Sequence, residues 1–254
     1  MYFADGTLHP YIPITKTITT VQQRHVYDRP FSRSTIYDKI NTCDRTKREI
    51  PEKRVTFDKI LKIVVILDES GSMDSVRTKM IESINDLIKE QKQVKDRTAT
   101  FTLVKFNDRV NRVIKNEILS DVSYISSEDY NPSGSTALYD AIADTINWFR
   151  DEKNVLVVIV TDGQENASRK YSKREVSDII ESKKQYDDWS FVYLSNDLKT
   201  AEQGKQLGLN ISRNSSNCVL KQNDYGNFMA NDLNIAITNY RTKGISVQSQ
   251  LNRN

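Results

Sequence analysis

Two apolar runs of this 254-residue chain each end in an aspartate, in a context that could bind a cation. The first, "ILDESGSMD" (66–74), places two serines at alternate positions after its acid, and the second, "VTDGQEN" (160–166), also ends its apolar run in an acid. A third segment, "NPSGSTALYD" (131–140), is rich in small polar residues and puts a threonine at the start of an expected helix. The oxygen-bearing side chains that these three segments supply are Asp68, Ser70, Ser72, Thr136 and Asp162.

Each of these segments, taken alone, can be explained by helix capping and turn formation without a bound ligand. Serine and threonine are favoured helix N-caps, and aspartate and glycine favour turns. The combination of two strand-end carboxylates with three hydroxyls is more specific, because it contains oxygen ligands and neither His nor Cys. Such a set suits hard cations, and a mixed octahedron of water, hydroxyl and carboxylate suits Mg²⁺ or Mn²⁺. We therefore predict a site for one of these two ions.

The elements that must position this site follow from hydrophobic patterning. Continuous apolar runs at 62–68, 154–162 and 189–195 are typical of strands buried on both faces. Alternating segments joined by Asn107-Asp108-Arg109 predict a β-hairpin. Helical spacing of apolar residues and one further short strand pattern predict the remaining elements, which are helices over 76–92, 136–149, 172–185, 198–209 and 224–240, and an edge strand over 216–222.

This order of elements predicts an α/β fold. We expect a Rossmann-like, doubly wound, mostly parallel central sheet with one antiparallel edge hairpin strand, helices on both faces and an extended N-terminal arm. In such open sheets, ligands bind beyond the carboxyl ends of strands, at the point where the strand order reverses. The loops that carry the two aspartates end at that edge, so the fold could bring the predicted ligands together.

The chain divides into three predicted segments: an extended basic arm (1–57), the α/β domain (58–242) and a polar C-terminal tail (243–254). Residues 1–60 carry a charge balance of +4 within a total of +3. That balance, with acids interspersed, is too weak to predict nucleic-acid binding. The arm is read either as a loosely packed extension or as an element that docks on a neighbouring subunit or partner.

The chain shows no feature of a membrane or secreted protein. No apolar run approaches the roughly 18 residues of a membrane span, and the first residues lack the pattern of a secretory signal. Cys43 and Cys218 are therefore interpreted as reduced thiols, and we expect a cytoplasmic protein. Abundant Lys, Asn, Ile and Tyr hint at an AT-rich genome, such as that of a phage or large DNA virus, which leaves a virion location open.

The motif resembles that of the von Willebrand factor type A (VWA) domain with its metal-ion-dependent adhesion site (MIDAS). The family pattern is Asp-x-Ser-x-Ser after the first strand, a threonine on a middle loop and an aspartate after the fourth strand. The resemblance covers residues 58–242, and the five matching residues occur in the family's order. It implies that both serine hydroxyls bind the cation, that the threonine binds it in a partner-bound state, and that the aspartates hold coordinated waters or bind directly. It also implies that an acidic group of a partner protein takes the last position.

Three functions are therefore weighed. The first is a cation-dependent protein-binding module, and the second is a structural or assembly subunit, of a virion or large complex, that self-assembles through residues 1–57. The third is a metal-dependent hydrolase, which we disfavour because zinc ligands are lacking and a two-metal site would need more than two strand-end acids. A serine hydrolase needs a histidine, and the only two, His9 and His25, lie in the arm. The chain also lacks a phosphate-binding loop motif and a nucleophile elbow, so we predict no enzyme. Glu69 and Glu165 are read as surface helix or loop acids that could tune the local charge.

Overall fold

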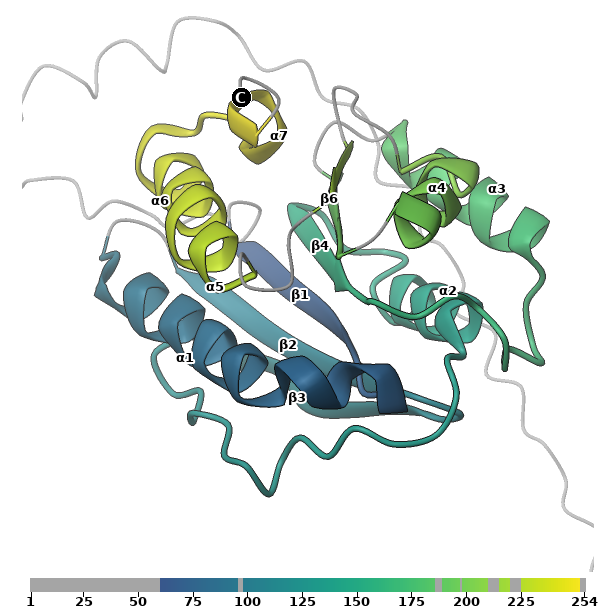
Figure 1. The fold of residues 1–254 in the computed structure, drawn as a ribbon. Coiled ribbons are helices and arrows are strands. Elements are labelled where there is room, and N and C mark those ends of the chain that lie inside the picture. The colour runs from purple at the N-terminus through teal and green to yellow at the C-terminus, as the bar shows by residue number, and fades with distance from the viewer. Residues whose placement is uncertain are drawn as a thin grey trace, which may run out of the picture. The chain divides into compact units, whose positions relative to one another are not determined.

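A computed structural model of the chain describes residues 60–95, 98–185, 189–196, 198–209, 215–219 and 225–251. The predicted arm, residues 1–57, lies outside this part of the chain. Within it, a six-stranded sheet runs through the centre and helices lie around it (Figure 1). No helix in these ranges is both long enough and apolar enough to cross a membrane.

The sheet has the strand order β3-β2-β1-β4-β5-β6. All neighbouring strands are parallel except β3, which pairs antiparallel with β2 at one edge. The strands are β1 (Leu61–Asp68), β2 (Ala99–Phe106), β3 (Val110–Ile118), β4 (Val155–Val160), β5 (Trp189–Ser195) and β6 (Ser215–Val219). The predicted mostly parallel sheet with one antiparallel edge hairpin strand is confirmed.

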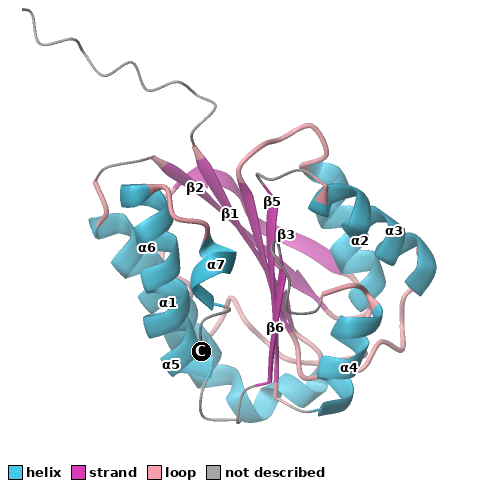
Figure 2. Ribbon diagram, turned by 90° about the horizontal axis from the view of Figure 1, so that it is seen from above, coloured by secondary structure: helices cyan, strands magenta, loops and turns pink. Residues whose placement is uncertain are grey.

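The helices cover both faces of the sheet, as predicted. Figure 2 shows α1, α5 and α6 on one side and α2, α3 and α4 on the other. The helices are α1 (Arg77–Gln93), α2 (Leu138–Trp148), α3 (Lys173–Lys184), α4 (Leu198–Gln206), α5 (Tyr225–Asn227), α6 (Asn234–Lys243) and α7 (Val247–Leu251). A π-helical segment over Phe228–Leu233 joins α5 to α6.

Strand β1 shows why this sheet must be covered twice. Successive residues of a strand point to opposite faces, so its apolar residues enter two separate cores. Ile63 and Val65 belong to the core under α1 and α6, whereas Val64 and Ile66 belong to the core under α2 and α3. All four are at most 1% exposed. The continuous apolar run is therefore satisfied only between two helical layers.

Part of the segment predicted as a polar C-terminal tail (243–254) forms a helix. Helix α6 ends at Lys243, and the next residue, Gly244, adopts a left-handed conformation with φ of 72° before the chain forms α7. Val247 is 2% exposed, and Leu251, four residues later, packs against the same core. Two apolar residues on one helical face are too few for the sequence pattern to predict that α7 packs against the core. The predicted boundaries between the three segments are otherwise untested.

The strand order reverses between β1 and β4, which places the switch point at their carboxyl ends. Leu67 pairs with Val160, so the two strands end level with each other. Residues 119–137, between β3 and α2, contain neither helix nor strand. This loop reaches the same edge of the sheet, where Ser133 N donates to the carbonyl of Glu69 at 2.8 Å. Loops of this length in compact domains usually have a function.

Candidate metal centre

The two predicted aspartates leave neighbouring strands at the same edge of the sheet. Asp68 is the last residue of β1, and Asp162 lies two residues beyond the end of β4. Asp68 is fully buried, whereas Asp162 is half-buried. Parallel pairing of β1 and β4 therefore brings together two acids that are far apart in the sequence.

The serine loop connects these acids through its hydroxyl groups. Ser70 N donates to Asp68 Oδ1 at 2.7 Å, and the Oγ atoms of Ser70 and Ser72 lie 3.1 Å apart. Ser72 Oγ donates to Asp162 Oδ1 at 2.5 Å. A continuous series of polar contacts thus runs from the first aspartate to the second.

Buried side chains anchor this loop from below. After Ser70 the chain forms a 3-10 turn over Gly71–Val76, and Met73 in that turn is completely buried beneath α1. Gly71 N donates to the carbonyl of Gly134 at 3.1 Å, which ties the serine loop to the loop before α2. The apolar anchor leaves Ser72 exposed above it.

Thr136 reaches the site from the loop before α2. Its hydroxyl lies close to the backbone of Gly163 and to Asp68. A Cβ atom built on Gly163 would lie 2.6 Å from Thr136 Oγ1 and 3.2 Å from Asp68 Oδ2. Real Cβ atoms essentially never show the first distance, so a side chain at this position would have to displace Thr136 Oγ1. The structure therefore brings all five predicted residues together, and their binding of a cation stays a prediction.

An open hollow of about 430 Å³ lies over these groups. One water occupies about 30 Å³ in the liquid, so the hollow has room for a hydrated cation and an entering side chain. The polar residues at its wall are Ser70, Ser72, Ser135, Thr136, Asp162, Gln164 and Asn166. No lysine or arginine is among the described residues that line it.

The electrostatics of Asp68 favour a nearby cation. Burial raises the pKa of its carboxyl from 3.8 to about 6, and the charge of Asp162 adds to the rise, while hydrogen bonds from Thr161 and Ser70 oppose it. In the described part of the chain, no group of three or more His, Cys, Asp or Glu side chains could hold a metal. A cation here would therefore depend on the hydroxyl groups, and this oxygen-only set fits a hard divalent ion.

Three residues that support the site were missed in the sequence. Thr161 Oγ1 donates to Asp68 Oδ2 at 2.6 Å, and the buried Tyr130 hydroxyl donates to the carbonyl of Asp68 at 2.6 Å. Asn166 Oδ1 accepts from Thr136 N at 2.9 Å. Thr161 and Asn166 lie within four residues of Asp162, so their position near the site could have been predicted from the sequence. Their hydrogen-bond partners could not, because these come together only in the folded chain.

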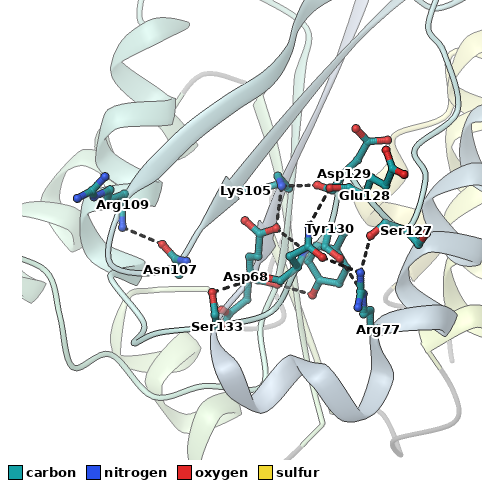
Figure 3. Close-up of polar contacts among 12 residues, drawn as sticks. Asp68, Arg77, Lys105, Asn107, Arg109, Ser127, Glu128, Asp129, Tyr130 and Ser133 are labelled. Atoms are coloured by element: carbon teal, nitrogen blue, oxygen red, sulfur yellow. Dashed lines mark hydrogen bonds and ion pairs between the residues drawn. The ribbon is translucent and has the colours of Figure 1, made fainter.

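Glu69 differs from the surface acid that the sequence suggested. It is only 7% exposed, and its Oε1 accepts from Lys105 Nζ and from Asn131 N, both at 2.7 Å. Figure 3 shows Lys105 beside Asp129 and Tyr130. The acid between two predicted ligands is therefore part of an internal ion pair.

Glu165 also has a structural role that the sequence did not reveal. Its side chain, half-buried, accepts from the backbone N–H groups of Tyr139, Ala167 and Ser168 and from the Ser168 hydroxyl, at 2.7 to 2.9 Å. These contacts fix the loop after β4 against the start of α2. The interpretation of Glu165 as a loop acid was right about its place and wrong about its exposure to solvent.

Comparisons with known proteins agree with the fold. A structure described as von Willebrand factor type A from Catenulispora acidiphila has a TM-score of 0.50 at 15% identity, covering 72% of this chain and 43% of that chain. The PilB minor pilin from Streptococcus sanguinis has a TM-score of 0.52 at 11% identity, covering 71% of this chain and 62% of the pilin. The chain thus spans less than two thirds of each protein. A comparison with curated protein sequences finds no match.

The sequence model of the von Willebrand factor type A domain matches residues 62–234. That range begins in β1 and ends at the start of α6, so it contains the whole sheet and all three loops of the candidate site. The match includes more than half of the chain, and the six-stranded sheet has the predicted topology. The chain therefore belongs to the von Willebrand factor type A domain family.

Proposed function

We propose that this chain is a divalent-cation-dependent protein-binding module with a MIDAS at the carboxyl edge of its sheet. Mg²⁺ or Mn²⁺ would be bound by the hydroxyls of Ser70 and Ser72, with Thr136 joining when a partner is bound. Asp68 and Asp162 would hold coordinated waters or bind the ion directly. The last coordination position would receive an acidic group of a partner protein.

The observation that carries this proposal is the series of contacts from Asp68 through both serines to Asp162, which opens onto the hollow. Two carboxylates balance the charge of a divalent cation, and neutral hydroxyls add none. A cation held mainly by hydroxyls stays electrophilic and binds an incoming carboxylate strongly. The open hollow gives such a carboxylate access.

The same arrangement argues for binding over hydrolysis. A serine nucleophile needs a base that removes its proton. The two histidines of the chain, His9 and His25, lie outside the residues that match the family, and the Ser70 and Ser72 hydroxyls contact each other and a carboxylate. We therefore propose no catalytic role for these serines.

Thermal unfolding of the full chain tests the proposal. Mg²⁺ or Mn²⁺ at 100 times its dissociation constant should stabilise the folded state by about 2.7 kcal/mol, because only the folded chain assembles the site. For a domain of this size, that corresponds to a rise of roughly 5–10 °C in Tm. EDTA should remove the rise.

The matched pair of variants is Asp68→Ala and Asp74→Ala. Both remove one acid from the same short segment, but Asp74 is exposed and lies outside the hollow. Only Asp68→Ala should abolish the cation-dependent rise in Tm. A rise of equal size in both variants, or no rise in the unaltered chain, contradicts the proposal.

A further inference from the structure

Glu69 is connected to the loop before α2 through both its side chain and its backbone. Oε1 accepts from Lys105 Nζ and from Asn131 N, and the carbonyl accepts from Ser133 N at 2.8 Å. Glu69 also stands between Asp68 and Ser70 in the chain, so its backbone adjoins two of the candidate ligands. A third carboxylate is thus present at an edge that would hold a divalent ion.

Lys105 is the cation that faces this third carboxylate. It comes from β2, where its backbone pairs with Leu67, and its Nζ lies 2.7 Å from Glu69 Oε1. Nζ also donates to the carbonyl of Asp129, a contact that Figure 3 shows. The side chains of Lys105 and Glu69 are 14% and 9% exposed. Charges so far removed from water are weakly screened.

The charges at this edge explain why the pair matters for function. Asp68 and Asp162 together balance a divalent cation. Glu69 without a partner would add an uncompensated negative charge and would repel an acidic group of a partner. Lys105 cancels that charge and leaves the cation able to accept an anion.

We propose that Lys105 determines specificity at this site, by neutralising Glu69 so that the metal-bearing edge accepts an acidic partner group. The inference rests on the proposed function and adds a residue to it that binds neither metal nor partner. Two unit charges about 10 Å apart at an effective dielectric of about 20 interact by enough to change a binding constant about tenfold. Loss or gain of one charge at this pair should therefore be measurable.

Two variants with opposite charge effects separate this role from a merely structural one. Glu69→Gln keeps an oxygen that can accept from Lys105 and from Asn131 N, and it leaves the lysine charge uncompensated. Lys105→Met leaves the glutamate charge uncompensated. A structural ion pair predicts that both variants weaken binding, whereas charge control predicts effects of opposite sign.

The experiment uses the full chain with Mn²⁺ as the metal and acetate as the acidic probe. Electron paramagnetic resonance measures free Mn²⁺, and water-proton relaxation of the bound ion measures acetate as it displaces water. Glu69→Gln should bind acetate about tenfold more tightly and Mn²⁺ more weakly. Lys105→Met should bind acetate about tenfold more weakly and Mn²⁺ at least as tightly. The double variant should return both affinities to within about threefold of the unaltered chain.

Lys89→Met is the matched control, because Lys89 is an exposed lysine on α1 and should change neither affinity. Circular dichroism checks that each variant is folded, and if Lys105→Met fails to fold, the tighter acetate binding of Glu69→Gln still decides. Acetate binding that weakens in both variants, or stays within threefold in Glu69→Gln, overturns this inference and leaves the proposed function standing. An unaltered chain that binds no Mn²⁺ overturns both.

Discussion

Two pairs of acids differ in the groups that satisfy them. Asp140, in the first turn of α2, and Glu165, in the loop after β4, form the first pair, and Asp68 and Asp162 of the candidate metal site form the second. Glu165 accepts three backbone N–H groups and the Ser168 hydroxyl, and Asp140 accepts the N–H groups of residues 169–171. A carboxylate has about four acceptor positions. The backbone therefore occupies most of the capacity of these two acids, and their charge holds loops in place.

Asp68 is as deeply buried as Asp140 but accepts from fewer backbone N–H groups. One backbone N–H and the hydroxyls of Thr161 and Ser70 donate to it, and a second acid lies nearby. Burial raises its pKa to about 6, which shows that the protein alone does not compensate its charge fully. The difference separates acids that organise the chain from acids that have capacity for a cation. Burial or charge alone would not distinguish them.

The largest loss of stability should come from replacing an acid that the backbone holds, such as Glu165. Glu165→Ala leaves several backbone N–H groups without their acceptor, and each hydrogen bond to a charged group contributes about 1.5–3 kcal/mol. We expect the free energy of unfolding in urea to fall by about 3 kcal/mol, equally in EDTA and in Mg²⁺. The exposed Glu90→Ala on α1 should lose almost nothing. If stability fell only in Mg²⁺ and not in EDTA, Glu165 would belong to the metal site, and the distinction between the two pairs of acids would be wrong.

A smaller effect, confined to stabilisation by the cation, should come from adding a single methyl group at the candidate metal site. In Gly163→Ala the new Cβ would lie 2.6 Å from Thr136 Oγ1, whereas in Gly71→Ala the nearest atom is the Gly134 carbonyl oxygen at 3.6 Å. Gly163→Ala should therefore lose the stabilisation of about 2.7 kcal/mol that a cation at 100 times its dissociation constant provides. Gly71→Ala should keep it. Equal cation-dependent shifts in Tm would show that the space beside Thr136 does not matter.

The smallest effect is the dependence of cation binding on pH. The pKa of Asp68 is raised from 3.8 to about 6, so in the metal-free chain its contribution to stability is complete below about pH 4 and is lost as pH rises through 6. Cation and proton compete for this carboxylate. Mn²⁺ affinity should therefore fall about tenfold per pH unit below 6 and level off above 7. Affinity that is constant from pH 5 to 7 would contradict the role of Asp68.

Much of the candidate site could be predicted because strand ends are visible in the sequence. The apolar runs stop at Asp68 and just before Asp162, and parallel strands bring their carboxyl ends together, so the meeting of these acids follows from the pattern. Thr136 was found because its segment ends in a helix. The hairpin between β2 and β3 was predicted from a different signal, the alternating segments joined by Asn107-Asp108-Arg109.

The supporting residues could not be found in this way. Glu69 occupies a turn in the sequence, and its burial depends on Lys105, which reaches it only because β2 pairs with β1. The helix α7 contains a single fully buried apolar residue, Val247, which gives no periodic signal. Partners fixed by three-dimensional packing leave no spacing in the sequence from which they could be predicted.

Direct titration with Mn²⁺ tests the central claim most simply, because it asks whether these oxygens bind an ion at all. Electron paramagnetic resonance of the full chain should show one bound Mn²⁺ per chain at pH 7.5. Asp162→Asn should lose that binding, and Asp140→Asn, the matched change in the backbone-held group, should retain it. Equal Mn²⁺ binding by the two variants, or none by the unaltered chain, would contradict the account.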